Sequence, residues 1–209
     1  MFRDRKDAGI RLANALEKYR GQEVVVFALP KGGVVLGAEI AMKLNVPLDL
    51  VLAKKIGHPY NPEYAIGAVA EEGEPIFNQF EVASVDPVWF QKEVERTRAE
   101  LKRRRLEYLR DTEPHDVEGK IAVIVDDGIA TGLTMMAAIK EMEKRKAKQI
   151  IVAIPVTPYV IAQRLMAMGV ELVSLQIERA YLGAVGAYYA DFQQVTNGEV
   201  IALLKQVNS

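Results

Sequence analysis

Residues 122–134, with the sequence AVIVDDGIATGLT, constrain what this chain can fold into more than any other stretch. An apolar run that favours a buried strand ends in two adjacent carboxylates, Asp126 and Asp127, and a loop rich in glycine and threonine follows. A helical pattern begins at Leu133. This order predicts a strand, a turn and a helix N-terminus, whose unpaired N–H groups and dipole stabilise a phosphate. Because the two carboxylates suit a pair of sugar hydroxyls, one loop is expected to hold both ends of a ribose 5-phosphate.

Strands and helices alternate along the rest of the chain. Apolar and β-branched runs predict strands at 24–29, 48–53, 120–125, 150–154 and 170–177. Amphipathic spacing, capping residues and proline positions predict helices at 7–19, 34–44, 86–111, from 133, and 158–169. This alternation predicts right-handed crossovers and an α/β fold with a doubly wound, mainly parallel sheet. Ligands of such sheets bind beyond the carboxyl ends of the strands, which is where the 126–132 loop falls.

The composition argues against several classes of protein. The 209-residue chain has no cysteine, two histidines and a net charge of −1, which disfavours disulfides, thiolate chemistry, a multi-histidine metal centre and binding of a polyanion by the whole chain. Glutamates interrupt the basic helix at 92–110, so a solvated helix is a better interpretation than a nucleic-acid-binding one. The N-terminus lacks an apolar signal core, and no apolar stretch is long enough to cross a membrane. We expect a cytoplasmic protein with neither a membrane nor a nucleic acid as partner.

A second anion-binding loop is predicted directly after the first strand. Its sequence, Leu29-Pro30-Lys31-Gly32-Gly33, places one positive charge beside two glycines that let the backbone approach an anion closely. A helix begins at once after this loop, so backbone N–H groups and the lysine ammonium are expected to converge there. An ordinary strand-to-helix turn is the alternative interpretation.

The 122–134 stretch resembles the phosphoribosyl pyrophosphate (PRPP) signature of the type I phosphoribosyltransferases. Asp126 and Asp127 match the acid pair of that signature, whereas Gly128 departs from it, because the family usually has an aliphatic residue there. The resemblance implies that the acids bind the ribose 2- and 3-hydroxyls and that the following backbone wraps the 5-phosphate. It assigns PRPP binding to Asp126, Asp127, Gly128, Ile129, Ala130, Thr131, Gly132 and Thr134. The whole chain is closest in pattern to uncharacterised bacterial phosphoribosyltransferase-domain proteins, and an ordinary buried strand with a glycine turn is the alternative.

The resemblance also implies a pyrophosphate site. This site comprises Lys31, Gly32 and Gly33, with a cis peptide bond between Pro30 and Lys31, together with Lys54 and Lys55 from a mobile loop at about 54–78. Such a loop closes over the site and excludes water, since a ribosyl oxocarbenium ion in the open would hydrolyse. The predicted catalytic residues are Lys31, Lys55 and Asp127, and the candidate proton carriers are Glu63, Glu71, Glu72 and His58. Solvated loop charge is the alternative for the residues of the mobile loop.

Residues 178–209 are expected to form a small C-terminal hood on an α/β PRPP-binding core at 1–177. Aromatic residues gather in this tail, and the order of parts resembles the hood of purine-type enzymes, which places Tyr181 on the base. Stacking of an aromatic ring on a base contributes about 1–3 kcal/mol. Tyr188 and Tyr189 fit a hood core better, and a cap packed by its own tyrosines is the alternative for Tyr181.

The function implied by the resemblance is transfer of the ribose 5-phosphate of PRPP onto a nitrogenous base, with release of diphosphate. Mg²⁺ bound with PRPP, and held by Asp126 and Asp127 directly or through water, would make the diphosphate a better leaving group. Hypoxanthine and guanine are disfavoured, since Ala130 stands where their transferases carry an aspartate base and residues 155–158 lack their lysine. A regulatory protein that binds PRPP or a nucleotide without turnover is the alternative, and the assembly, a homodimer included, is left open.

Overall fold

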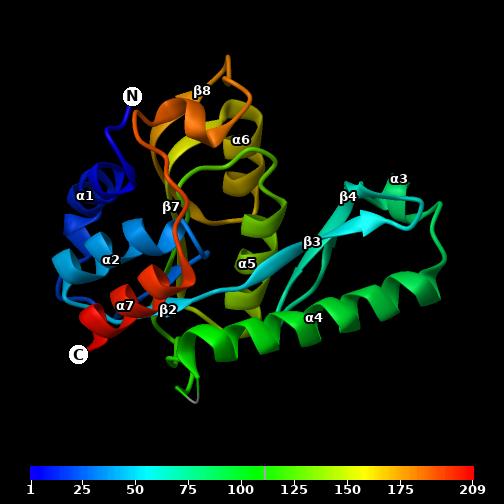
Figure 1. Cartoon of the computed structure of the whole chain (residues 1–209), viewed down its shortest axis with the longest axis horizontal. Coiled ribbons are helices and arrows are strands. Elements are labelled where there is room, and N and C mark those ends of the chain that lie inside the picture. Colours follow the sequence, from blue (N-terminus) through cyan, green and yellow to red (C-terminus); the bar gives the residue numbers. More distant parts are fainter. Residues whose placement is uncertain (111) are drawn as a thin grey trace.

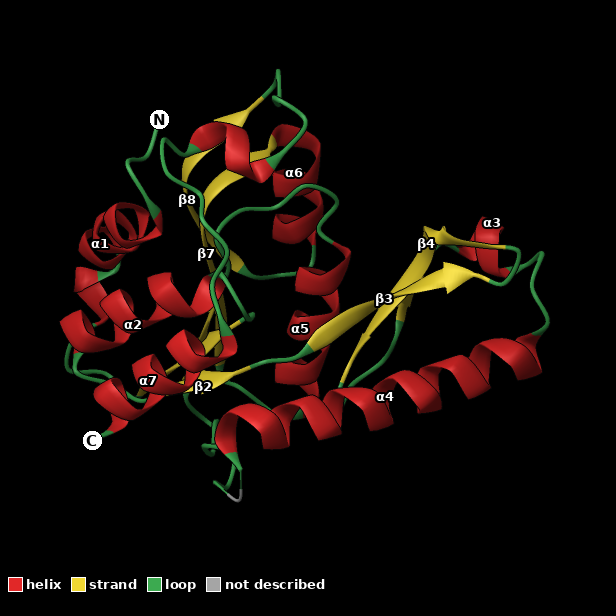
Figure 2. Ribbon diagram, in the orientation of Figure 1, coloured by secondary structure: helices red, strands yellow, loops and turns green. Residues whose placement is uncertain are grey.

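The computed structural model describes residues 1–110 and 112–209 as a layered α/β domain from which a narrow arm extends (Figures 1 and 2). The domain is built on a sheet with the strand order β2–β1–β6–β7–β8. Its strands are β1 (Val24–Ala28), β2 (Leu48–Leu50), β6 (Ile121–Val125), β7 (Gln149–Pro158) and β8 (Glu171–Glu178). Every neighbouring pair is parallel, which confirms the predicted α/β class and parallel sheet.

Helices cover both faces of the sheet, and apolar residues fill the space between the layers. All residues of β1 and β6 are buried, as continuous β-branched runs require in a parallel sheet that is covered on both sides. One face carries α1 (Arg5–Ala15), α2 (Gly33–Leu44) and α7 (Asn197–Asn208), and the other carries α5 (Leu133–Lys144) and α6 (Tyr159–Ala167). Two short 3-10 helices complete the domain, η1 (Glu17–Tyr19) and η2 (Val185–Tyr188).

Helix α7 is an element that the sequence prediction does not contain. The Thr196 hydroxyl accepts a hydrogen bond from the Glu199 N–H (3.1 Å) and so caps the helix. Val200 and Leu204 then enter the core beside α2. The capping threonine and the helical spacing of these apolar residues are a signal that the prediction of a hood leaves out.

The arm takes the place of the loop that the sequence predicts at about 54–78. Strands β3 (Ala53–His58), β4 (Asn61–Ala70) and β5 (Ile76–Phe77) form a separate antiparallel sheet, and the short helix α3 (Gln79–Val82) follows it. The prediction of a partly irregular segment is wrong for most of these residues, because apolar side chains of β4 pack against α4 and α5 and thereby favour a strand. Mobility of the arm stays a prediction.

Helix α4 (Pro87–Leu109) runs along the arm and joins it to the sheet domain (Figure 1). Its predicted start is confirmed, since the Asp86 carboxylate accepts a hydrogen bond from the Val88 N–H (2.9 Å) and a proline begins the helix. The predicted charge pairing on its solvent side is also present, for example between Arg96 and Glu93 (2.8 Å). Among the described residues, no helix combines the length and the apolar character that crossing a bilayer would need.

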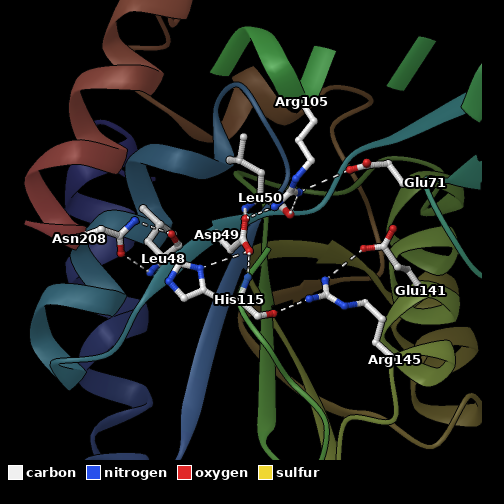
Figure 3. Close-up of polar contacts among 9 residues, drawn as sticks. All are labelled: Leu48, Asp49, Leu50, Glu71, Arg105, His115, Glu141, Arg145 and Asn208. Atoms are coloured by element: carbon white, nitrogen blue, oxygen red, sulfur yellow. Dashed lines mark hydrogen bonds and ion pairs between the residues drawn. The ribbon is translucent and has the colours of Figure 1, made fainter. Parts of the chain in front are cut away.

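A buried charge cluster holds the arm against the edge of the sheet (Figure 3). The Asp49 carboxylate on β2 is 1% exposed and accepts hydrogen bonds from Arg105 Nη2 (2.6 Å) and from the His115 N–H (2.8 Å). Arg105 comes from α4 and also contacts Glu71, directly after β4 (3.5 Å). Burial alone would raise the pKa of Asp49, but the His115 hydrogen bonds and the Arg105 charge lower it to about 2. This one carboxylate therefore ties α4 and the loop before β6 to β2.

Glu141 on α5 is a second buried carboxylate in this region (Figure 3). Its Oε1 accepts a hydrogen bond from the Glu72 N–H (3.1 Å), and its Oε2 lies 3.6 Å from Arg145 Nη1. Burial and the nearby charge of Glu71 raise the pKa of Glu141 to about 7, although Arg145 opposes the shift. Because the folded pKa is above the unfolded one, the proton on Glu141 stabilises the fold fully below pH 4.5, and this stabilisation is lost as the pH rises toward 7.

We expect the Glu141→Gln variant to lose this pH dependence. The amide keeps an oxygen for the Glu72 N–H but carries no charge. When the pH rises from 5 to 8, the free energy of unfolding of the variant should therefore increase by about 1–3 kcal/mol relative to that of the parent protein. Urea denaturation at the two pH values measures this gain. Glu143→Gln, at an exposed position of the same helix, is the matched control and should show no gain. If the free energies of unfolding of the parent and of Glu141→Gln differed by the same amount at both pH values, the raised pKa of Glu141 would be contradicted.

Candidate functional site

Two loops leave the sheet side by side at its carboxyl edge. Strands β1 and β6 are neighbours, with Ala28 paired to Val125, so the segments that follow them begin at the same level. The Leu29 N–H donates to the Val125 carbonyl (2.9 Å). A Cβ on Gly33 would lie 2.7 Å from that carbonyl oxygen, so a glycine is needed for this approach. The structure therefore brings together the two loops that the sequence identified separately.

The 30–33 loop has few free donors, and they are well defined. The Pro30–Lys31 peptide bond is cis, as the resemblance implies. The N–H groups of Gly33 and Val34 are already bonded within the turn (3.1 and 3.2 Å). The exposed Lys31 ammonium and the amides of Lys31 and Gly32 are therefore the groups that this loop can present to an anion.

The 126–132 loop ends in a glycine turn at the N-terminus of α5. Gly132 has a φ of 78°, in the left-handed region that favours glycine. No side chain of the described residues caps this helix. The Ile129 N–H is engaged with a carbonyl of β7 (3.3 Å), whereas the N–H groups of residues 130–134 donate to no carbonyl among the described residues and are available to a phosphate. Phosphate binding by these N–H groups stays a prediction.

The acid pair that follows β6 is partly neutralised. The Asp127 carboxylate lies 2.8 Å from Nε of Arg5, and the two side chains are 15% and 12% exposed. The Asp126 carboxylate accepts a hydrogen bond from the Asp127 N–H (2.8 Å). Burial raises the pKa of Asp126 well above its usual range, and the neighbouring Asp127 charge adds to the shift. The pair therefore carries less net negative charge than two solvent-exposed aspartates would.

Arg5 is a residue of this site that the sequence analysis missed. Besides Asp127, its guanidinium contacts the Gln193 carbonyl (Nη1–O 2.5 Å) and lies 3.9 Å from the centre of the Phe192 ring. Arg5 is the first residue of α1 and lies 122 positions before Asp127. No local signal distinguishes it from the neighbouring charged residues, since only the fold brings α1 to this edge of the sheet.

The C-terminal segment packs directly on the acid pair. The Tyr189 hydroxyl donates to the Asp127 carbonyl (2.6 Å), and burial raises the pKa of this phenol. A Cβ on Gly128 would lie 2.5 Å from a methyl carbon of Val185. Gly128, which departs from the family signature, therefore leaves room for the C-terminal segment that covers the loop.

Tyr181 lies in the same C-terminal segment, packed against another tyrosine. Its ring stacks on Tyr188 with a centroid separation of 5.5 Å and 25° between the planes. The Tyr181 hydroxyl and the Gln176 side-chain oxygen are buried with no hydrogen-bond partner among the described residues. Buried polar groups ordinarily have partners, so a ligand group is a candidate partner for each. Base binding at Tyr181 stays a prediction, whereas the burial expected for Tyr188 and Tyr189 is confirmed.

The two arm lysines have different surroundings. The Lys54 ammonium pairs with Glu100 on α4 (2.9 Å), so its charge is engaged within the arm. Lys55 is exposed and shares a face of β3 with Ala53, which packs toward α5. Lys55 therefore fits a diphosphate-facing role better than Lys54 does.

The candidate proton carriers lie in different parts of the arm. Glu71 belongs to the buried charge cluster at its base, where burial raises the pKa of this carboxyl. Glu63 is exposed on β4, and His58 Nδ1 accepts the Tyr60 N–H in the hairpin turn (3.1 Å). Glu71 thus has a packing role that the sequence did not reveal.

A cavity of about 390 Å³ lies between the arm and the loop at the start of α5. Ile76 and Phe77 line it from the arm, Thr131 from the loop, Leu133 from the first turn of α5, and Arg164 from α6. A ligand on the loop would therefore extend toward a space that the arm already borders.

The acid pair fits a metal ion that arrives with a substrate. Among the described residues, no three histidine, aspartate or glutamate side chains form a metal-binding group. Mg²⁺ keeps several waters and usually binds through one or two carboxylates together with substrate phosphates. Asp126 and Asp127 supply two carboxyl groups of this kind.

Comparisons with known proteins identify relatives over the full chain. Residues 4–191 match the family model described as phosphoribosyl transferase domain. Two Mycobacterium tuberculosis proteins that carry a provisional phosphoribosyl transferase name, MT0597 and Rv0571c, are each 37% identical to the chain over 215 residues. The match covers 100% of this chain and 47% of each relative, so the chain spans about half the length of the curated relatives it matches.

Solved structures share the fold. The crystal structure of TT1426 from Thermus thermophilus has 40% sequence identity and a TM-score of 0.84, and the match covers 99% of this chain and 98% of that one. A hypothetical protein from Neisseria gonorrhoeae, crystallised with bound ppGpp, has 12% identity and a TM-score of 0.50 over 99% of this chain and 98% of that one. The second likeness concerns the fold alone.

We expect Gly32→Ala to disturb the point where the two loops meet. A Cβ at this position would lie 2.1 Å from Asp127 Oδ2 and 2.8 Å from Arg5 Nε, closer than atoms can pack. Side-chain insertion into a packed region costs about 1–3 kcal/mol, so the free energy of unfolding should fall by that amount. Urea denaturation measures the change, with Gly198→Ala as control, because the nearest atom to a Cβ there is 3.8 Å away. A Gly32→Ala variant as stable as the control would show that the loops do not approach this closely.

Proposed function

The chain belongs to the phosphoribosyl transferase domain family, and from this premise we propose that it transfers the ribose 5-phosphate of PRPP to a nitrogenous base and releases diphosphate. The observation that carries the proposal is the meeting of three groups at one edge of the sheet: the Lys31 loop, the acid pair and the N-terminus of α5. Each of them suits one part of PRPP, namely the diphosphate, the ribose hydroxyls and the 5-phosphate.

In the proposed complex, the 5-phosphate binds at the N-terminus of α5. The amides of residues 130–134 donate to its oxygens, and the helix dipole favours its charge. The ribose hydroxyls donate to Asp126 and Asp127, whose backbone is fixed by its neighbours in β6 and by Tyr189. The sugar is thereby oriented before the reaction begins.

The proposed reaction breaks the bond between ribose C1 and the diphosphate while a nitrogen of the base bonds to C1, and the proton of that nitrogen passes to the diphosphate or to water. Negative charge grows on the departing diphosphate, and the Lys31 ammonium with the amides of Lys31 and Gly32 receives it. Lys55 adds a second positive charge from the arm. The arm also borders the site, and exclusion of water there protects the electron-poor C1 from hydrolysis.

Mg²⁺ is proposed to accompany PRPP, and it would lower the charge of the diphosphate and improve it as a leaving group. Asp126 and Asp127 are the residues that would hold it, directly or through water. The acceptor base is proposed to lie against Tyr181. The Tyr181 hydroxyl and the Gln176 side-chain oxygen, which have no hydrogen-bond partner within the described part of the chain, are candidate contacts of the base. Hypoxanthine and guanine remain disfavoured, because Ala130 supplies no acid or base.

Diphosphate release from PRPP and Mg²⁺ across a panel of nitrogenous bases tests the proposed function. Release that depends on one class of base supports the transferase. PRPP binding without release for any base would instead support the regulatory alternative. If the protein bound no PRPP, both the transferase and the regulatory function would be excluded.

We expect Asp127→Asn to weaken PRPP binding about tenfold or more while the fold is retained. The substitution keeps the shape of the side chain but removes a charged acceptor of a ribose hydroxyl, and charge-assisted hydrogen bonds are about twice as strong as neutral ones. Titration calorimetry measures the affinity, and circular dichroism checks the fold. Asp116→Asn, at an exposed position, is the control. If Asp127→Asn bound PRPP as tightly as the parent protein does, Asp127 would not belong to the PRPP site.

We expect Lys31→Ala to lower kcat about a hundredfold and to change PRPP affinity much less, because the charge that Lys31 meets develops in the transition state. Steady-state kinetics at saturating PRPP measure kcat. Lys43→Ala, in the last turn of α2, is the control. Weaker binding with an unchanged kcat would contradict the assigned role.

A further inference from the structure

We propose that Arg5 is a positioning residue of the PRPP site, which fixes one carboxylate oxygen of Asp127 and leaves the other oxygen for a ribose hydroxyl. This inference rests on the proposed function, because the ribose is that of PRPP. Arg5 lies outside both sequence motifs and reaches the site only through the packing of α1.

The Arg5 guanidinium is held on three sides. Its Nε donates to Asp127 Oδ2 (2.8 Å), its Nη1 donates to the Gln193 carbonyl (2.5 Å), and the Phe192 ring faces it at 3.9 Å. A planar group with two directed hydrogen bonds and a stacked ring has little freedom to rotate. Asp127 is therefore bound by a rigid partner.

Burial distinguishes this ion pair from the other one on α1. The Arg5 and Asp127 side chains are 12% and 15% exposed, whereas Arg11 and its partner Asp7 are 52% and 19% exposed. Exposed ion pairs contribute little, and the attraction between charges increases as water is excluded. The Arg5–Asp127 pair is thus the one able to fix the orientation of a carboxylate.

The second carboxylate oxygen of Asp127, Oδ1, is not bonded to Arg5. The Asp127 N–H is engaged with the Asp126 carboxylate, its carbonyl accepts from Tyr189, and its Oδ2 accepts from Arg5. Within the described part of the chain, no N–H group donates to Oδ1, and the carboxyl of Asp126, whose pKa the Asp127 side chain helps to raise, lies beside this carboxylate. A carboxylate held in this way has one acceptor ready for a ribose hydroxyl and loses little entropy on using it.

Arg5 also lies beside the 30–33 loop. A Cβ on Gly32 would lie 2.8 Å from Arg5 Nε, so the loop and the guanidinium meet with no side chain between them. The acid pair, the 30–33 loop and the C-terminal segment therefore share one cation. Its charge offsets that of Asp127 at a site that has to accept a polyanion.

A double-mutant cycle tests this inference. Titration calorimetry with PRPP and Mg²⁺ gives the dissociation constants of the parent, Arg5→Ala, Asp127→Ala and the double variant. We expect each single variant to lose about tenfold or more in affinity and the double variant to lose no more than Asp127→Ala, because Arg5 acts through Asp127. Arg5→Lys should recover part of the loss, since it keeps the charge but not the planar group. Arg11→Ala, on the same helix, should bind as the parent does.

The outcomes distinguish a failure of the positioning role of Arg5 from a failure of the proposed function. Additive losses, or parent-like affinity in Arg5→Ala, would overturn the positioning role while the proposed function stands. A parent protein that binds no PRPP would overturn both. Should Arg5→Ala fail to fold, as thermal melting would show, Arg5→Lys with and without Asp127→Ala provides the same cycle.

Discussion

The parallel pairing of β1 with β6 is the constraint on which the rest of the site depends. Because Ala28 is level with Val125, the loops after the two strands start beside each other, and glycines at 32 and 33 leave no side chain to separate them. Two loops that are far apart in the sequence, and that we propose to bind anions, therefore become one surface. A ligand with phosphate groups at both ends of a sugar is the occupant that we propose for this surface, and the chain belongs to the phosphoribosyl transferase domain family.

The protein stabilises one buried and one partly buried aspartate in different ways. At the base of the arm, both oxygens of Asp49 are occupied, one by Arg105 and the Leu50 N–H and the other by His115. In the candidate site, Arg5 occupies a single oxygen of Asp127. A saturated carboxylate has no capacity for a ligand, whereas a half-occupied one does. The number of partners thus distinguishes Asp49 from Asp127, the acid that we propose to bind a ligand, although both are paired with an arginine from a distant helix.

The parts of the protein that could be predicted are those whose signal is local. Strand ends, glycine turns and helix starts are encoded within a few neighbouring residues, so the sheet and the two loops agree with the sequence analysis. The cis peptide bond at Pro30–Lys31 is expected only from the resemblance to the family, and the structure contains it. The arm strands could not be predicted in this way, because their burial depends on α4 and α5. Arg5 and the packing of Val185 on Gly128 have no local signal, since distant segments create both contacts.

A crystal structure of the protein with PRPP and Mg²⁺ tests the central claim most directly. We expect the 5-phosphate within hydrogen-bond distance of the amides at 130–134, the ribose hydroxyls on Asp126 and Asp127, and the diphosphate at Lys31. PRPP bound elsewhere, with these amides facing solvent, would contradict this claim.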